Sequence, residues 1–115
     1  QMCIRDSAYV VLDCGTHINP DTCVAQMEGA VVFGLSLALK SEITFDKGSA
    51  VQGNLDTYEL IRMMESPRVT VDLVQSEALP AGVGEPGVPP VAPALTNAIF
   101  AASGQRIRKL PVSLA

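Results

Sequence analysis

One carboxylate in this chain, Glu85, lies in a loop of glycines, prolines and aliphatic residues. A glutamate that only faces solvent would not require such neighbours. The loop, residues 80–90, reads PAGVGEPGVPP. Gly82 and Gly84 allow the backbone to approach a ligand closely or to adopt a positive φ, and Pro86 restricts Glu85 to an extended geometry that fixes its direction. A carboxylate held among apolar neighbours becomes a better general base near neutral pH. A catalytic base is therefore one of two roles that the loop predicts for Glu85.

A structural role for Glu85 is the alternative. The side chain could cap the positive end of a helix that follows the loop, or point to solvent from a turn. The loop lacks the Lys–Ser/Thr pair of a P-loop. The GxGxxG spacing of Gly82, Gly84 and Gly87 lacks the following strand and acidic residue of a dinucleotide-binding fold. On the residues alone the structural role is favoured, because carboxylates in unusual surroundings are also structural.

Strands and helices around the loop must position it. Patterns of β-branched, aromatic and alternating residues predict strands at 8–13, 42–45, 50–54 and 68–75. Asn19 can cap a helix that has Pro20 in its first position and runs to about Lys40. A second helix follows the loop and ends at Gly104, and a short strand is an option in the tail 106–115. These elements predict an α+β fold, with a sheet of about four strands and two helices packed on it.

The helix expected over 20–40 is apolar on nearly all of its faces, which indicates burial by several partners. Gly29 and Gly34 are unfavourable in a helix, so we expect them to permit close backbone approach. A chain of 115 residues buries such a helix poorly, so we expect a piece of a longer polypeptide. Residues 1–7, QMCIRDS, match no pattern that continues, and we interpret them as a non-native leader.

Composition excludes several classes of protein. The chain is 48% hydrophobic and 17% charged, which is not the balance of a disordered segment. Its net charge of −4 argues against a nucleic-acid partner. Its three cysteines form no CxxC pair and no metal-ligand spacing. The longest apolar run, 29–39, is short for a bilayer, so we expect no transmembrane segment.

Several motifs in order resemble one family. The stretch GVGEPGVPPVAPALTNAIFAASGQRIRKLP resembles the C-terminal end of molybdenum-hydroxylase large subunits, with isoquinoline 1-oxidoreductase beta subunits nearest and xanthine dehydrogenases and aldehyde oxidases as wider kin. Upstream, DCGTHINPDTCVAQMEGAVVFGLSLAL is similar to the family's D-x-G, N-P and Q-x-E-G segment, and GNLDTYELIRMMESPRVTVDLV fits in order and spacing. The resemblance covers residues 8–115 and implies the C-terminal part of a larger molybdopterin-binding domain.

The resemblance also implies a reaction and a site. A molybdenum-dependent oxidoreductase of this kind hydroxylates an N-heteroaromatic or aldehyde carbon with oxygen from water. Glu85 matches the glutamate of the family's GVGE motif, the general base for the hydroxide on molybdenum. Gln26 matches a glutamine that hydrogen-bonds the pterin, and Gly84 would line the same site; the protein itself does not ligate the metal. For Gln26, an ordinary polar position on a buried helix is the alternative.

Cofactors and partners follow from the same resemblance. Molybdopterin, as the cytosine dinucleotide in the bacterial two-subunit type, would carry the molybdenum. A small subunit would hold [2Fe–2S] clusters, and the rest of the large subunit would complete the pterin site, so the isolated chain is expected to be inactive. The competing hypothesis is a non-catalytic α+β assembly module that folds alone with Glu85 exposed. A partial domain instead predicts exposed apolar surface on the 20–40 helix and unpaired strand edges.

Overall fold

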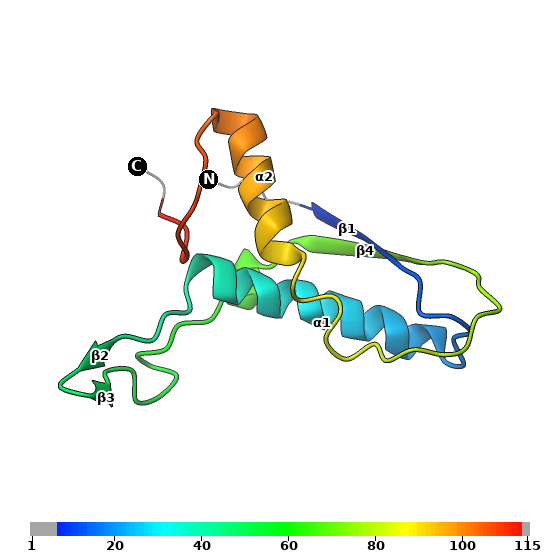
Figure 1. Cartoon of the computed structure of the whole chain (residues 1–115), viewed down its shortest axis with the longest axis horizontal. Helices are drawn as coiled ribbons and strands as arrows, with labels where there is room; N and C mark the ends of the chain where they lie inside the picture. The colour runs from blue at the N-terminus through cyan, green and yellow to red at the C-terminus, as the bar shows by residue number, and fades with distance from the viewer. Residues whose placement is uncertain (1–6, 114–115) are drawn as a thin grey trace.

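One long helix organises the computed structural model, which describes residues 7–113. In chain order the elements are β1 (Ser7–Leu12), α1 (Pro20–Leu39), β2 (Phe45–Asp46), β3 (Ser49–Ala50), the 3₁₀ turn η2 (Met63–Glu65), β4 (Arg68–Leu73) and α2 (Val91–Ser103). Figure 1 shows α1 running through the middle, α2 rising from it, the β1–β4 pair beside it, and the β2–β3 hairpin projecting from one end. The expected leader lies outside the described residues except for Ser7, which begins β1.

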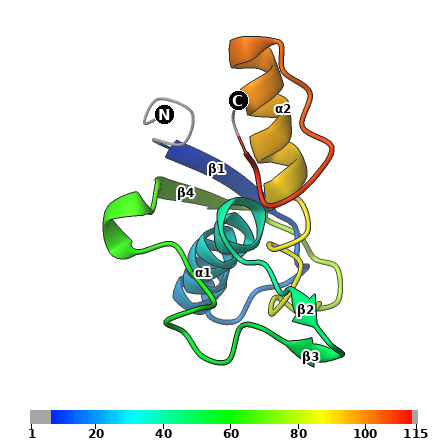
Figure 2. The ribbon, with the colours of Figure 1, turned by 90° about the vertical axis from the view of Figure 1, so that its left-hand side faces the viewer.

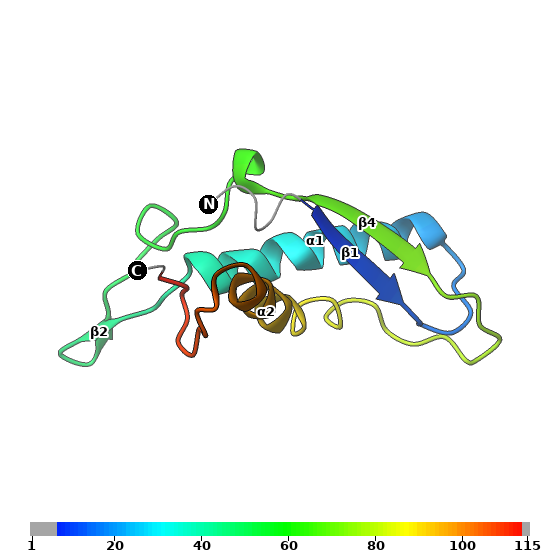
Figure 3. The same cartoon turned by 90° about the horizontal axis from the view of Figure 1, so that it is seen from above.

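The strands form two separate pairs. β1 and β4 run parallel (Figure 3), with Val10 opposite Val71, whereas β2 and β3 are antiparallel. The sequence predicted one sheet of about four strands, but the four strands form two separate two-stranded sheets. The predicted α+β class is correct. A parallel pair needs a long crossover between its strands, and α1 occupies that crossover. Alternate residues of both strands, among them Ala8 and Val69, pack against the core.

Helix α1 begins where the sequence predicted. The Asn19 side chain accepts a hydrogen bond from the Thr22 backbone N–H at 3.2 Å, and Pro20 opens the helix. Both β1–β4 and α2 lie on one side of α1 (Figure 2). The core between these elements comprises Val31, Leu35, Ala38, Ile61, Leu95 and Ile99. Burial on this side explains why an apolar helix persists in so small a chain.

The β2–β3 hairpin is shorter than predicted. Its turn is made by Lys47 and Gly48, both at positive φ, as in the tight turns that join antiparallel strands. The expected strands 42–45 and 50–54 reduce to two residues each. Beyond them the Gln52 side chain accepts a hydrogen bond from the Thr44 backbone N–H at 2.7 Å, so a side chain replaces part of the backbone ladder.

Helix α2 ends at the predicted glycine. Gly104 has a φ of 72° and its N–H donates to the Phe100 carbonyl at 2.8 Å, which closes the last turn. No strand forms in the described part of the tail, 105–113, so that option was wrong. Instead the Val112 backbone N–H donates to the Ala38 carbonyl at 2.8 Å and holds the tail against the end of α1.

Part of the apolar surface is uncovered. Phe33 and Leu37 on α1 are 55% and 37% exposed, and Tyr9 on β1 is 78% exposed. The outer edge of β1 pairs with no strand among residues 7–113. These are the features that the sequence predicted for a partial domain. By length and composition α1 would also suit a membrane span, a test that core helices of soluble proteins pass as well.

Candidate functional site

A shallow hollow of about 290 Å³ lies between α1 and the loop before α2. Its lining comes from Gln26, Gly29, Ala30 and Phe33 on the helix and from Gly84, Glu85 and Val88 on the loop. The structure thus brings together the three residues that the sequence singled out, Glu85, Gln26 and Gly84. Their chemical roles stay predictions.

The helical side of the hollow is one face of α1. Residues three or four apart on a helix are neighbours on its surface, and Gln26, Gly29, Ala30 and Phe33 follow that spacing. An ideal Cβ on Gly29 would meet no atom within 4 Å, so this glycine leaves open space in the hollow. The close backbone approach expected at Gly29 is therefore absent within the described part of the chain.

Two other glycines dock the loop onto α1. An ideal Cβ on Gly34 would lie 2.6 Å from the Cβ of Val91 and 3.1 Å from the Val88 carbonyl oxygen. An ideal Cβ on Gly87 would lie 2.6 Å from the Cβ of Ala30. Side chains are almost never found so close, so both contacts require glycine. The sequence predicted this for Gly34 but not for Gly87, because the partner of Gly87 is distant along the chain.

The loop is also fixed at its start. The Ala81 backbone N–H donates to the Cys14 carbonyl at 2.9 Å, and the Thr16 backbone N–H donates to the Ala78 carbonyl at 2.9 Å. Nearer the site, the Val88 N–H donates to the Glu85 carbonyl at 3.0 Å and closes a turn. The segment that carries Glu85 is therefore held at both ends against the segments that begin and form α1.

Glu85 itself is exposed, so the apolar enclosure expected from its neighbours is not present within residues 7–113. It does not cap α2 either, because the capping position is Pro90 and no side chain bonds there. Exposure is what an assembly module would also show, but the residue lines a concave surface that it shares with Gln26. Neither side chain has a hydrogen-bond partner within the described part of the chain, so both are free to bind a ligand.

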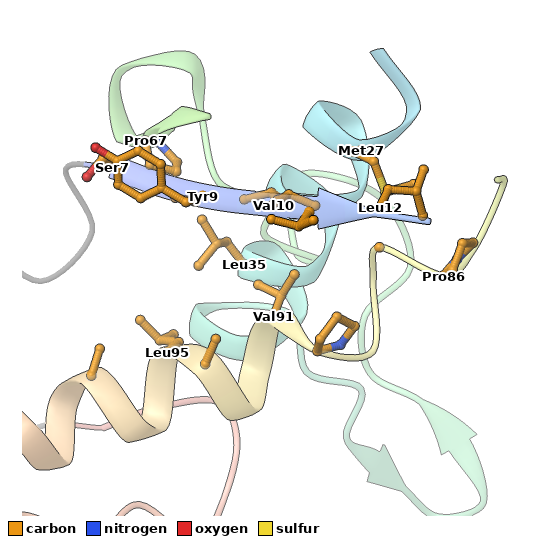
Figure 4. Close-up of a pocket in the computed structure, with 17 residues that line it drawn as sticks. Ser7, Tyr9, Val10, Leu12, Met27, Leu35, Pro67, Pro86, Val91 and Leu95 are labelled. Atoms are coloured by element: carbon orange, nitrogen blue, oxygen red, sulfur yellow. The ribbon is translucent and has the colours of Figure 1, made fainter. Parts of the chain in front are cut away.

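A second cavity, an apolar groove of about 440 Å³, lies on the other side of the same loop between β1, α1 and α2. Figure 4 shows Val10, Leu35 and Val91 facing one another across it. No charged side chain lines it. Because Pro86 lines the groove and Glu85 lines the hollow, the loop separates a groove without charged side chains from the hollow that contains Glu85 and Gln26.

The sequence matches a family model described as the molybdopterin cofactor-binding domain over residues 5–67, more than half of the chain. The chain belongs to this family. Among curated relatives, the membrane-bound aldehyde dehydrogenase (pyrroloquinoline-quinone) of Gluconacetobacter polyoxogenes is 41% identical over 90% of the chain. The isoquinoline 1-oxidoreductase subunit beta of Brevundimonas diminuta is 36% identical over 90% of it. The chain spans 13% of the length of each of these two relatives.

Solved structures agree with this assignment. The chain superposes on the reconstituted CO dehydrogenase from Oligotropha carboxidovorans with a TM-score of 0.74, at 25% identity over 88% of this chain and 14% of that one. The quinoline 2-oxidoreductase from Pseudomonas putida 86 gives a TM-score of 0.69 at 25% identity, with the same coverage. The α+β arrangement is therefore part of a larger fold in these proteins.

The lining of the hollow leaves room for a large polar cofactor and offers it a polar side chain. Gly29 and Gly84 both leave space where a Cβ would otherwise project, since an ideal Cβ at either would meet nothing within 4 Å. Beside Gly29, one helical turn away, the exposed amide of Gln26 offers both donors and acceptors. The open space at Gly29 and Gly84 and the exposed amide of Gln26 are therefore compatible with a molybdopterin cofactor.

Proposed function

We propose that this chain forms one wall of the active site of a molybdenum-dependent oxidoreductase that hydroxylates an N-heteroaromatic or aldehyde carbon with oxygen derived from water. The observation that carries the proposal is the hollow that Glu85 and Gln26 both line, where neither side chain has a hydrogen-bond partner among the described residues. Family membership supports the cofactor. The relatives named for aldehyde and isoquinoline oxidation support the reaction class.

Each residue of the hollow has a distinct task in this proposal. Gln26 hydrogen-bonds the pterin through its amide, while Gly29 and Gly84 leave room for the cofactor. When bound, the molybdenum cofactor would provide a binding place for the water-derived oxygen and a two-electron acceptor for the substrate. Glu85, which lines the hollow, acts as the general base and accepts a proton at its carboxylate. The docked loop holds the backbone of Glu85 in place, and a bound cofactor and substrate would then fix the carboxylate, as a general base requires.

The full reaction would need the rest of the large subunit and a second subunit. The hollow is shallow, and the chain spans only 13% of its relatives, so the rest of the large subunit would close the site and cover the apolar groove. A small subunit with [2Fe–2S] clusters would carry the electrons away, and the pterin would be the cytosine dinucleotide. The isolated chain would be inactive.

The test is the substitution Glu85→Gln in the full-length enzyme, because glutamine keeps the shape but cannot take the proton. We expect turnover to fall at least ~100-fold with the molybdenum content unchanged. Glu77→Gln is the matched control, since Glu77 is an exposed carboxylate in the same connection but outside the hollow. Normal turnover in Glu85→Gln would refute the assignment of Glu85 as the general base. A purified enzyme that holds pyrroloquinoline quinone and no molybdenum would refute the proposal as a whole.

A further inference from the structure

Two buried cysteines lie in contact near the start of α1. Cys14 follows β1 and Cys23 lies on the helix, and the two residues are 4% and 8% exposed. Both are free thiols, and their side chains share a hydrogen bond. We infer that Cys14 and Cys23 form a redox-sensitive pair, which hydrogen peroxide converts into a disulfide that ties the turn after β1 to α1. The pair acts independently of the reaction proposed above.

Cys14 belongs to the turn that holds the start of the loop before α2. Its carbonyl accepts a hydrogen bond from the Ala81 backbone N–H at 2.9 Å. An ideal Cβ on the next residue, Gly15, would overlap the Leu79 carbonyl oxygen, so the backbones of turn and loop touch. Figure 1 shows the two segments side by side, where the turn leads into α1. A cross-link at Cys14 therefore acts on the backbone that anchors the loop.

Cys23 belongs to the buried face of α1. Met27, four residues further on, lies on the same face and is also buried. An ideal Cβ on Gly87 would lie 3.0 Å from the Met27 sulfur, so this face supports the far end of the loop. Because these contacts are made within residues 7–113, the two thiols are enclosed by this chain itself.

The oxidation balances with one molecule of hydrogen peroxide. The thiolate of one cysteine attacks the O–O bond, which gives a sulfenic acid and, with a proton, water. The second thiol attacks the sulfenic sulfur, so that the S–S bond forms and a second water leaves. Peroxide gains the two electrons that the thiols lose. Burial and the nearby Cys23 thiol raise the pKa of Cys14, so Cys14 forms a thiolate less readily and we expect Cys23 to react first.

Burial selects a small oxidant for this pair. A bulky disulfide such as oxidised glutathione must bring one of its sulfur atoms to the attacking thiolate, which the enclosure of both residues prevents. Peroxide needs far less space. The two sulfur atoms are already in hydrogen-bond contact, so rotation of the side chains can close the bond length of about 2 Å.

The experiment oxidises the cofactor-free full-length protein with hydrogen peroxide and digests it without reduction. We expect mass spectrometry to find a peptide pair joined through Cys14 and Cys23, and dithiothreitol to restore both thiols. Oxidised glutathione should give less than about a tenth of this product in the same time. Cys23→Ala is the matched control, because it removes one sulfur with little change of volume and should leave Cys14 uncrosslinked.

Hydrogen exchange measures the effect of the disulfide on the loop. The peptide that contains Ala81 should exchange this amide at least about tenfold more slowly after oxidation, because the acceptor of its hydrogen bond lies on a cross-linked residue. The same peroxide treatment should leave the exchange of Cys23→Ala unchanged.

Three outcomes would overturn the inference. Cys14 could be joined to a cysteine other than Cys23. Both thiols could survive a dose of peroxide that oxidises them in the urea-unfolded protein. The cross-linked protein could exchange the Ala81 amide as fast as the reduced protein, in which case the disulfide does not hold the loop. None of these measurements involves turnover, so Glu85→Gln tests the proposed function separately.

Discussion

The substitution Gly34→Ala tests how the loop that carries Glu85 is docked onto α1. The new Cβ would lie 2.6 Å from Val91 Cβ, 2.8 Å from its Cγ2 and 3.1 Å from the Val88 carbonyl oxygen. Val91 Cβ is bonded to the backbone of the first residue of α2, so no change of rotamer relieves the contact. The loop and α2 must move instead, and such overpacking costs about 1–3 kcal/mol.

Gly29→Ala is the matched control, because the same substitution on the same helix meets no atom within 4 Å. Both variants gain about 1 kcal/mol of helix propensity, so this gain cancels in the comparison. We expect the cofactor-free full-length protein to be less stable with Gly34→Ala than with Gly29→Ala by about 1–3 kcal/mol, measured by denaturant unfolding. Equal stability of the two variants would refute the close contact at Gly34.

Turnover gives a second measurement on the same pair. A shift of the loop by about 1 Å moves the Glu85 carboxylate and is expected to lower the kcat of Gly34→Ala by about 100-fold. Gly29→Ala should also lose activity, but through weaker retention of molybdopterin, since its methyl group fills the space that faces the hollow. If Gly29→Ala kept its full molybdenum content and activity, the cofactor would not lie along this face of α1.

The remaining predictions concern the pterin contact, one buried thiol and one ion pair. Gln26→Ala should lower molybdopterin retention about tenfold through loss of a hydrogen bond, measured as molybdenum per protein after dialysis. Burial and the nearby Cys23 thiol raise the pKa of Cys14, so above pH 9 the unfolded chain releases a proton that the folded chain keeps. Stability should therefore fall as the pH rises beyond 9, and less steeply in Cys14→Ala, as pH-dependent unfolding curves would reveal. Lys40→Met breaks a partly exposed ion pair with Glu65, in which the nitrogen and oxygen lie 2.7 Å apart. The free energy of unfolding should fall by less than about 1 kcal/mol, and this difference should vanish in about 1 M salt. A larger fall would contradict the surface character of this pair.

Local features of this protein were predictable from its sequence because they depend on atoms a few residues apart. The start of α1 follows from the side chain of Asn19 and the fixed φ of Pro20. The end of α2 follows from the ability of Gly104 to adopt a positive φ. Ordered motifs around Glu85 and Gln26 were sufficient to indicate the family, which the match over residues 5–67 confirmed.

Tertiary structure decided the features that join distant segments. The partner strand of β1, the division of the strands into two pairs, and the contact of Gly87 with Ala30 depend on which surfaces meet when the chain closes. The apolar residues near Glu85 in the sequence suggested an enclosed carboxylate, yet the loop turns Glu85 outward while Pro86 faces the groove. Only the packing of the loop on α1 brings Glu85, Gln26 and Phe33 into one hollow, because side-chain neighbours across two segments follow from their docking and not from local propensity.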